Sequence, residues 1–296
     1  MAVAGFHSIA LVTFAAYPEL TPDDRLLASA LRRRGLEPVA ALWDDPREAW
    51  GAHGLVVPRS CWDYHQRAAE FARWLDRLER DGARVVNPVP TLRWNMRKTY
   101  LRDLGARGVP VVETAWVARG AETTLRRIAD ERGWEEMVVK PVVSASAHET
   151  WRAGRPALGE LEARVAAELR ERDLMVQPFL PGFTREGELS CILLAGRFSH
   201  AVRKRPRPGD FRVQEEHGGS VSPAVVPPDL VRLAAGAVAA APSPPVYARV
   251  DTVATDRGPL VTELELIEPA LYFGMGEGAA ERLAAALARI LAGARA

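Results

Sequence analysis

The stretch of residues 247–269, YARVDTVATDRGPLVTELELIEP, decides the fold of this 296-residue chain. Its two halves read as β-strands, which the turn at residues 256–259 (DRGP) joins into a hairpin. Because residues two apart on a strand share a face, Glu263 and Glu265 point the same way, and the hairpin brings Asp251 beside them. Three crowded carboxylates repel one another unless a hard divalent cation such as Mg2+ binds between them. A solvated acidic face is the alternative, and the nearby Glu268 favours a site over it.

Lysine is rare in this chain, since only Lys98, Lys140 and Lys204 occur among 39 basic residues. Lys140 lies in the apolar run 137–143, where a buried ammonium needs an anion such as phosphate. Lys98 lies in an expected helix over residues 95–104, whose amide dipoles also favour phosphate. Strand alternation turns Lys204 away from its neighbours in sequence. The alternatives are a snorkelling Lys140, an exposed helical Lys98 and a solvated strand edge at Lys204.

Composition narrows the class of protein. With 39 basic and 38 acidic residues the chain is nearly neutral, so nucleic acid is not the expected partner. No apolar run reaches the length of a membrane span, and no leader opens the chain, so we expect a cytoplasmic protein without membrane contact. Cys61 and Cys191 lie too far apart for a zinc motif, and we expect buried thiols. The length favours more than one domain.

The order of the expected elements indicates an α/β protein with additional α+β segments. Strand-like runs at 8–14, 38–43, 54–58 and 84–87 alternate with helical patterns at 26–34 and 66–80, which is typical of a parallel sheet. Farther along, hairpins are expected at 188–205 and 247–266. Further strands are expected at 115–117, 137–143 and 174–179, and further helices at 123–132, 157–172, 229–241 and 278–292.

A strand that ends in Gln177, Pro178, Phe179 and Leu180 leaves backbone groups free to bind an adenine ring in an apolar slot. By itself this motif is weak. Taken in order, however, these pieces resemble the ATP-grasp superfamily, in the branch of glutathione synthetase-like and ribosomal-protein glutamate ligase-like enzymes. The resemblance covers residues 90–275 and is weaker before them.

The resemblance implies a role for each motif. Asn95-Met96-Arg97-Lys98 and Val139-Lys140-Pro141 are similar to the two phosphate-lysine motifs of the family, and residues 176–180 are similar to its adenine hinge. ATP would then contact Lys98, Lys140, Ser144, Ser146, Gln177, Pro178, Phe179, Leu180 and the acidic residue Glu188. The implied metal ligands are Asp251, Glu263 and Glu265, for two Mg2+ ions or for Mn2+. The implied cations at the transferred phosphoryl group are Arg203, Lys204 and Arg212.

The sequence departs from the family pattern at two points. The loop after the second lysine reads Ser144-Ala145-Ser146-Ala147 instead of being glycine-rich, and Glu265 replaces the common Asn ligand. Both departures resemble the subgroup that contains the O-ureido-serine cyclo-ligase of cycloserine biosynthesis, which implies a part in antibiotic biosynthesis. The acceptor pocket would be shaped by Arg59, Asp63, Tyr64 and Glu268, together with Asp23 or Asp24.

The resemblance implies an ATP-dependent carboxylate–amine ligase that acts on a small amino-acid-like substrate. An acyl phosphate would form and be displaced by an amine, in an intramolecular ring closure or between two molecules, with release of ADP and phosphate. A small-molecule kinase with the same ATP chemistry and a non-catalytic ATP-binding module are the alternatives. The branch also contains homo-oligomers.

The resemblance further implies three parts, with ATP clamped between the second and the third. They are an N-terminal parallel α/β domain over residues 1–92, a central lid subdomain over residues 93–180, and a C-terminal subdomain with the metal site over residues 181–296.

Overall fold

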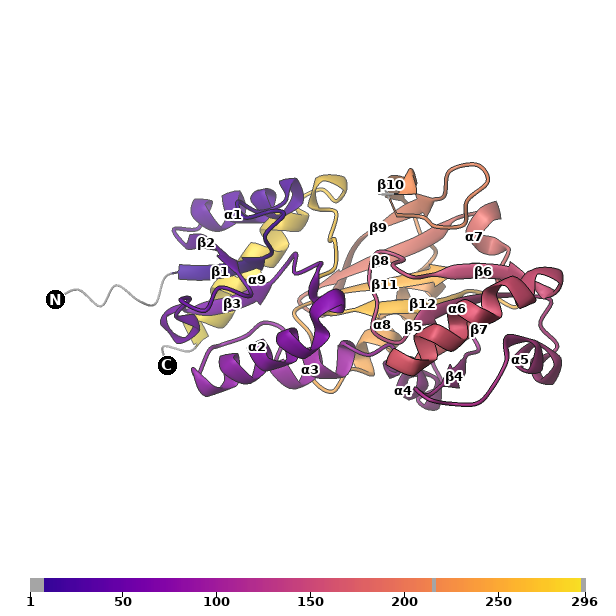
Figure 1. Cartoon of the computed structure of the whole chain (residues 1–296). Helices are drawn as coiled ribbons and strands as arrows, with labels where there is room; N and C mark the ends of the chain where they lie inside the picture. The colour runs from indigo at the N-terminus through magenta and orange to yellow at the C-terminus, as the bar shows by residue number, and fades with distance from the viewer. Residues whose placement is uncertain (1–7, 215–216, 294–296) are drawn as a thin grey trace.

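The structure, a computed structural model, describes residues 8–214 and 217–293 of the chain. Its strands form three sheets (Figure 1), which contain three, four and five strands. The family's mixed α/β and α+β character is therefore present in this chain. Each sheet uses residues from one region of the sequence, and the last helix of the described chain packs on the first sheet.

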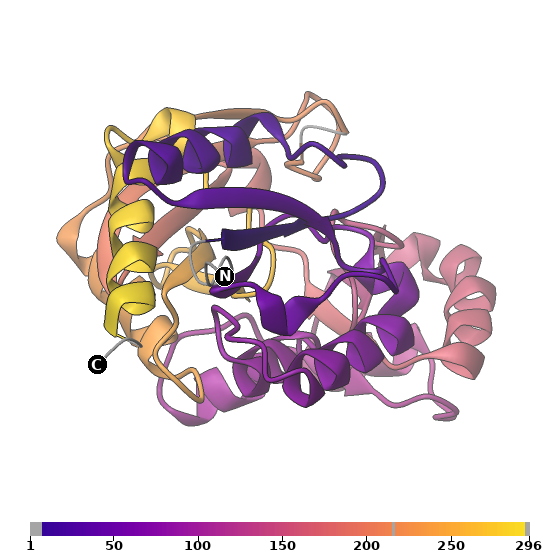
Figure 2. The same ribbon diagram turned by 90° about the vertical axis from the view of Figure 1, so that its left-hand side faces the viewer.

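The first sheet is parallel and has the strand order β2-β1-β3. Alternate residues of its central strand face opposite sides, so that Ile9 and Leu11 pack in the cluster of α1 and α9, and Ala10 and Val12 in that of α2. Both faces are thus covered, as parallel strands require. Figure 2 shows α1 and α9 side by side on one face. The elements are β1 (Ser8–Thr13), β2 (Glu37–Leu42), β3 (Leu55–Pro58), α1 (Pro22–Arg33), α2 (Ala68–Arg80) and α9 (Ala279–Gly293).

The second sheet is antiparallel and has the strand order β4-β7-β5-β6. Met137 and Val139 of its strand β5 pack against two helices, so alternation sends Val138 and Lys140 to the opposite face. This alternation is what points the lysine of an apolar strand into a cavity. The elements are β4 (Ala115–Val117), β5 (Glu136–Pro141), β6 (Trp151–Gly154), β7 (Leu174–Pro178), α5 (Leu125–Arg132) and α6 (Leu158–Glu171).

The third sheet is antiparallel, with the strand order β10-β9-β8-β11-β12. One face packs against α4 and α8, in a cluster that includes Leu104, Cys191 and Leu230. Ala195 and Gly196, both with positive φ, turn β8 into β9. The elements are β8 (Glu188–Leu194), β9 (Arg197–Arg205), β10 (Ser220–Ala224), β11 (Tyr247–Val253), β12 (Leu260–Glu265), α4 (Tyr100–Ala106) and α8 (Pro228–Ala239).

Two buried asparagines connect the first region to the third sheet. The Asn87 side chain donates to the carbonyls of Tyr247 and Leu266 and accepts from Val246 N. Asn95 donates to Leu264 O and accepts from Leu266 N, so its amide continues the ladder at the edge strand β12. The domain boundaries expected at residues 92 and 180 stay predictions.

Two sequence expectations need correction. The helix expected over residues 95–104 is in fact two helices, α3 (Val89–Asn95) and α4, and Lys98 lies in the break between them. Its amide donates to Val142 O at 2.9 Å, a tertiary bond that a continuous helix would exclude. The strand expected at 84–87 is reduced to one bridge between Val56 and Val85. The remaining helix is α7 (Gly182–Arg185), and short 3-10 turns lie at Trp50–Ala52, Tyr64–Arg67, Arg155–Ala157 and Phe273–Met275.

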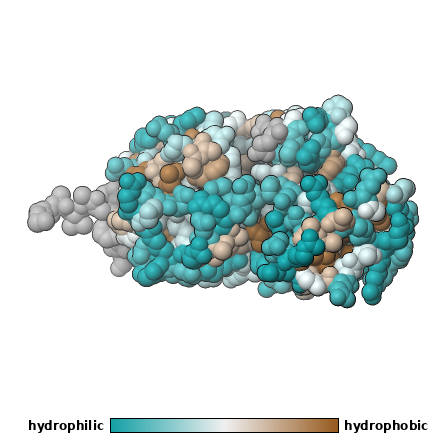
Figure 3. Space-filling view, viewed as in Figure 1, coloured by the Kyte–Doolittle hydropathy of each residue, from teal (hydrophilic) through white to brown (hydrophobic). Residues whose placement is uncertain are grey.

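Cys61 and Cys191 are buried free thiols, as expected. Across the described residues, every helix is too short or too polar to cross a bilayer. The face shown in Figure 3 is mostly hydrophilic, with hydrophobic residues in small separate groups.

Candidate active site

A cavity of about 240 Å³ lies between the second and third sheets. Its walls carry residues from β5, β7, β9, β11 and β12, from the loop after β5 and from the loop after β9. The predicted site residues that line it are Lys98, Lys140, Ser144, Ser146, Gln177, Pro178, Phe179, Leu180, Glu188, Lys204, Arg212, Asp251, Glu263, Glu265 and Glu268.

The hairpin of β11 and β12 brings the three predicted metal ligands together. Asp251 pairs directly with Glu263 across the two strands, and Glu265 follows on the same face. One oxygen from each carboxylate can be chosen so that all three atoms lie within 4.8 Å of one another. Three convergent carboxylate oxygens are hard donors of the kind that Mg2+ and Mn2+ prefer, so the residues present fit a divalent cation.

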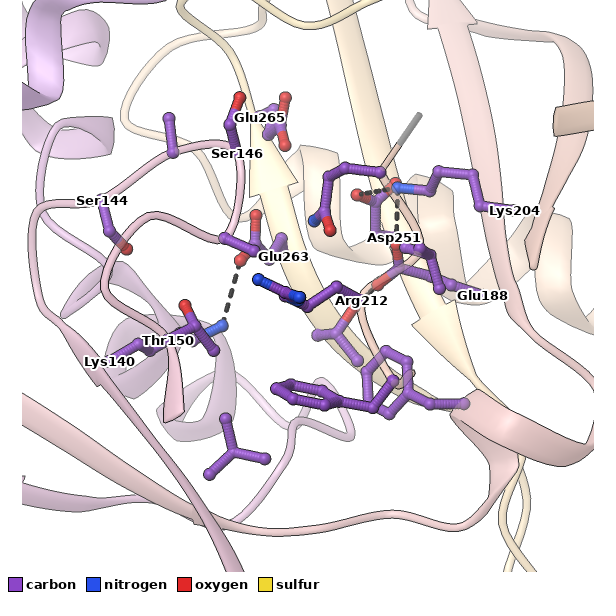
Figure 4. Close-up of a pocket in the computed structure, with 18 of the residues that line it drawn as sticks. Lys140, Ser144, Ser146, Thr150, Glu188, Lys204, Arg212, Asp251, Glu263 and Glu265 are labelled. Atoms are coloured by element: carbon purple, nitrogen blue, oxygen red, sulfur yellow. Dashed lines mark hydrogen bonds and ion pairs between the residues drawn. The ribbon is translucent and has the colours of Figure 1, made fainter. Parts of the chain in front are cut away.

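Two lysines from different elements meet at one of these acids. The Nζ atoms of Lys98 and Lys140 each lie 3.0 Å from Oε1 of Glu263. Figure 4 shows Lys140 reaching this carboxylate from β5, across the cavity from Lys204. Burial alone would raise the pKa of Glu263, but the two ammonium groups outweigh it and hold this pKa well below its usual range.

Lys204 is enclosed by acids on the other side of the cavity. Its ammonium contacts Glu188 at 2.5 Å and Asp251 at 2.9 Å, and its side chain is 5% exposed. Burial would lower the pKa of Lys204, but the two carboxylates raise it above its ordinary value. Glu188 also accepts from the Thr262 hydroxyl at 2.9 Å. In this arrangement Lys204 stabilises the acidic strands, and it also lines the cavity.

Arg249 is a site residue that the sequence analysis missed. It lies two residues before Asp251 on β11, and its guanidinium donates to both oxygens of that carboxylate and to Glu265. Burial would raise the pKa of Asp251, but Arg249 and Lys204 bring it down to about 2. The strand period of two was the available signal, because it places residue 249 on the face of residue 251.

Two further carboxyl groups are held against ionisation. Burial raises the pKa of Glu265 to about 7; Arg249 opposes this rise, and repulsion from Asp251 and Glu263 adds to it. Burial, together with repulsion from the neighbouring Glu265, raises the pKa of Glu268 to about 8. Among the described residues no other side chain pairs with the Glu268 carboxylate, although its own backbone N–H contacts it. A cationic ligand would therefore relieve charge at this end of the cavity.

The predicted adenine hinge forms the apolar end of the cavity. Phe179 donates its backbone N–H to Glu136 O, and the Gln177 amide donates to the Thr114 hydroxyl at 3.0 Å. The Arg152 guanidinium lies 3.5 Å from the centroid of the Phe179 ring, and Phe211 approaches the same ring edge-on. Aromatic rings beside backbone groups form a slot of the kind that a planar base can enter.

Two loops border the phosphate end. In the loop after β5, Ser144 donates its hydroxyl to Pro141 O, and Ser146, Ala147 and Glu149 have positive φ near 50°. Glycine adopts such left-handed conformations without strain, so these three residues hold them at a cost in energy. Arg212, in the loop after β9, is held by Asp210, whose pKa its hydrogen bonds lower.

Six predicted residues do not line the cavity, namely Asp23, Asp24, Arg59, Asp63, Tyr64 and Arg203. Arg203 points away from Lys204 and donates to Glu186 O, as strand alternation requires. Arg59 is 1% exposed and donates to Asp24 and to Pro269 O. Asp63 accepts from the Trp43 indole, and Tyr64 is buried in the core around α2. Within the loop of residues 59–65, it is Trp62 that reaches the cavity.

The cavity joins two lysines, an acidic triplet and an adenine-type slot, which defines the class of protein. Residues 137–271 match the model of the RimK-like ATP-grasp domain. A D-alanine–D-alanine ligase from Bacillus anthracis, solved with ATP, superposes with a TM-score of 0.65 at 14% identity, covering 98% of both chains. That likeness supports the fold alone.

More similar proteins place the chain within this class. Residues 9–87 match the model of the N-terminal domain of D-cycloserine synthetase DcsG. The cycloserine biosynthesis protein DcsG of Streptomyces lavendulae is 33% identical over 305 residues, which cover 96% of this chain and 98% of that protein. The crystal structure of D-cycloserine synthetase DcsG has a TM-score of 0.88 at 32% identity, covering 96% of this chain and 99% of that one.

The chain therefore belongs to the DcsG family of ATP-grasp ligases. It is an ATP-dependent enzyme of the amide-forming kind, and the acid triplet fits the divalent cation that such enzymes use.

Proposed function

We propose that this enzyme activates the carboxylate of a small amino acid with ATP and closes it onto a nitrogen of the same molecule. The observation that carries the proposal is the meeting of Lys98, Lys140 and the acid triplet in one cavity between two sheets. The names given to DcsG, a cycloserine biosynthesis protein and D-cycloserine synthetase, support a cyclic product of the cycloserine type.

In the first step, a carboxylate oxygen of the substrate attacks the γ-phosphorus of ATP, and ADP leaves. In the second step, the nitrogen attacks the acyl carbon and forms the carbon–nitrogen bond. The bond from this carbon to the phosphate oxygen breaks, inorganic phosphate leaves with the electron pair, and the nitrogen loses one proton. The protein positions the reactants and neutralises charge, so no covalent nucleophile is required. Divalent cations, two in this proposal, would be held by Asp251, Glu263 and Glu265 and would offset the phosphate charge.

The remaining residues divide between the two ends of the cavity. Residues 177–180 would receive the adenine, and Ser144, Ser146 and Glu188 would contact the rest of the nucleotide. Lys204, Arg212 and Arg249 would face the transferred phosphoryl group. Glu268 would bind the ammonium of the amino acid, and Arg59 would act through its bond to the adjoining Pro269 O.

The test is ADP formation by the full chain with ATP, Mg2+ and O-ureido-D-serine, with the cyclic product followed by mass spectrometry. Lys140→Ala and Glu263→Gln should each lower turnover at least 100-fold while the circular dichroism spectrum is retained. Glu131→Gln, at an exposed acid whose partner among the described residues is Arg127, is the matched control. Near-normal turnover in either site variant would remove the assigned site.

The same assay separates the alternatives. ADP with a stable phosphorylated product would indicate a kinase, and nucleotide binding without ADP formation would indicate a binding module. Turnover that requires two separate substrates would reject ring closure but retain the ligase.

A further inference from the structure

A segment without regular secondary structure, residues 267–272, follows β12 along the cavity. Each of its six successive backbone carbonyl oxygens lies within hydrogen-bond distance of a donor on a distant side chain, and the first shares the Tyr247 hydroxyl with Pro58 O. These contacts fix the path of the backbone although the segment belongs to no helix or sheet of the described chain. The donors, in order, are Tyr247 to Ile267 O, Trp62 to Glu268 O, Arg59 to Pro269 O, Arg249 to Ala270 O, and His200 to both Leu271 O and Tyr272 O.

The side chains of this segment alternate as they do on a strand. Glu268, Ala270 and Tyr272 line the cavity, whereas Ile267 and Leu271 are 1% and 0% exposed in the core. The segment therefore presents an acid, a methyl group and a phenol to the cavity, in that order. The two buried residues anchor this face from behind.

Tyr272 has φ 50° and ψ 47°, a left-handed conformation that residues with a Cβ adopt at a cost in energy. His200 holds it there, because its Nε2 lies 2.9 Å from Leu271 O and 3.1 Å from Tyr272 O. Since both partners are acceptors, Nε2 carries the proton, and Nδ1 accepts from the Ser199 hydroxyl at 2.9 Å. Gly276 packs on this ring so closely that a Cβ there would lie 2.5 Å from it.

The chemistry of the cavity beside this face suits an amino acid. Glu268, which pairs with no other side chain among the described residues, would ionise beside an ammonium group and pair with it. At the other end, Tyr272 lines the cavity and carries a hydroxyl that can donate a hydrogen bond to a carboxylate. Between the two, the side chain that lines the cavity is the methyl group of Ala270.

We propose that residues 267–272 form the amino-acid wall of the site, in which Tyr272 contacts the substrate carboxyl group, Ala270 limits substrate size, and His200 is a positioning residue. This proposal rests on the proposed function and adds to it two residues that contact the amino acid and one that positions them. The nucleotide is held by other walls, so the wall acts on the amino acid alone.

The first test is Tyr272→Phe, which keeps the ring and removes the hydroxyl. With O-ureido-D-serine as the probe, its KM should rise about 10-fold or more, the loss expected for one hydrogen bond to a charged group. The KM for ATP should stay within 2-fold. Tyr17→Phe, at a tyrosine outside the cavity lining, is the matched control. An unchanged amino-acid KM in Tyr272→Phe would overturn the assignment.

The second test separates positioning from general stability. His200→Ala should raise the amino-acid KM about 10-fold with the KM for ATP unchanged, and His200→Gln, whose amide can donate to the same carbonyls, should restore it. A purely structural role would lower the melting temperature and shift both KM values alike. Equal shifts, or no rescue by Gln, would overturn the role of His200.

The third test works without turnover. Calorimetry of D-cycloserine with the Mg-ADP-bound chain should show binding to wild type and at least 10-fold weaker binding to Ala270→Leu, with Mg-ADP affinity retained. Wild-type turnover decides the proposed function, whereas the differences between variants and wild type decide the wall. If wild type and Ala270→Leu bind D-cycloserine equally well, the wall alone is refuted. If wild type neither turns over O-ureido-D-serine nor binds D-cycloserine, both proposals are refuted.

Discussion

At the level of single residues, the acids of the cavity are neutralised by cations of the same chain. Lys98 and Lys140 share one oxygen of Glu263, while Lys204 and Arg249 share Asp251. Buried carboxylates without counter-ions would be costly, so the lysines stabilise the nucleotide-free protein. When Mg-ATP binds, phosphate oxygens can replace Glu263 as the partner of the two lysines, and the divalent cation can replace the lysines as the partner of Glu263. Metal and nucleotide should therefore bind cooperatively.

Replacing Lys140 by Met tests this exchange. Because Glu263 then keeps only Lys98, we expect Mn2+ without nucleotide to bind roughly 10-fold more tightly, and ADP without metal to bind more weakly. Electron paramagnetic resonance titration of Mn2+ and calorimetry of ADP measure the two changes. Arg127→Met, an exposed cation on α5, serves as control. Unchanged or weaker Mn2+ binding in Lys140→Met would contradict the exchange.

Glu268 gives the free enzyme a pH dependence of known sign. Its pKa rises from 4.5 to about 8 on folding, so between these values the folded state keeps a proton that the unfolded chain has lost. The free energy of unfolding therefore falls as the pH rises through this window. Glu268→Gln removes the effect and should be more stable than wild type by about 2 to 4 kcal/mol at pH 8.5, with little difference at pH 4.5.

Urea unfolding of both proteins at several pH values, without metal or nucleotide, measures this gap. Glu131→Gln again controls for the loss of a surface charge. A gap that is constant with pH would show that Glu268 ionises normally in the folded state.

At the level of elements, the β8–β9 hairpin has a tight turn with an unfavourable residue. Ala195 and Gly196 have φ 50° and 75°, and Ala195 is exposed. Positive φ at both central residues favours Asn-Gly. Ala195→Asn should raise the free energy of unfolding by about 0.5 kcal/mol, and Ala195→Val should lower it, because a β-branched residue resists this conformation. Thermal melts measure both, and stabilisation by Val would contradict the assignment of this turn.

The elements differ in how well the sequence predicts them. Hairpins and amphipathic helices follow from local periodicity, so β8, β9, β11, β12 and α9 lie where the sequence places them. The break at Lys98 depends on a bond to Val142 O, which local patterns do not encode. Likewise, the acid triplet follows from alternation within one hairpin, whereas Arg59 reads as a pocket residue until its partners Asp24 and Pro269 are known.

Across the whole molecule, the first sheet and the third share a hydrophobic cluster. This cluster contains Ile9 of β1, Leu31 of α1, Val202 of β9 and Leu287 of α9. Tyr247, on β11, donates its hydroxyl to Pro58 O at the end of β3. The helix α9 follows the third sheet in the chain and packs on the first sheet. Leu271 of the wall at 267–272 lies in the same cluster, so the wall and the first sheet depend on the same packing. We expect one cooperative unfolding transition for both.

Leu287→Ala tests this coupling, since the side chain is fully buried in α9. Its loss should cost about 2 to 5 kcal/mol and shift a single transition that tryptophan fluorescence and far-UV circular dichroism report at the same urea concentration. Leu26→Ala, at a leucine of α1 that is 43% exposed, should change little. If the first sheet and the rest of the protein unfolded independently, fluorescence and circular dichroism would report different urea midpoints in Leu287→Ala. Saturating Mg-ADP would then raise the midpoint of the cavity-forming part but not that of the first sheet. Coincident probes, both shifted upward by Mg-ADP, are the expected result, because a ligand of the cavity then stabilises the first sheet as well.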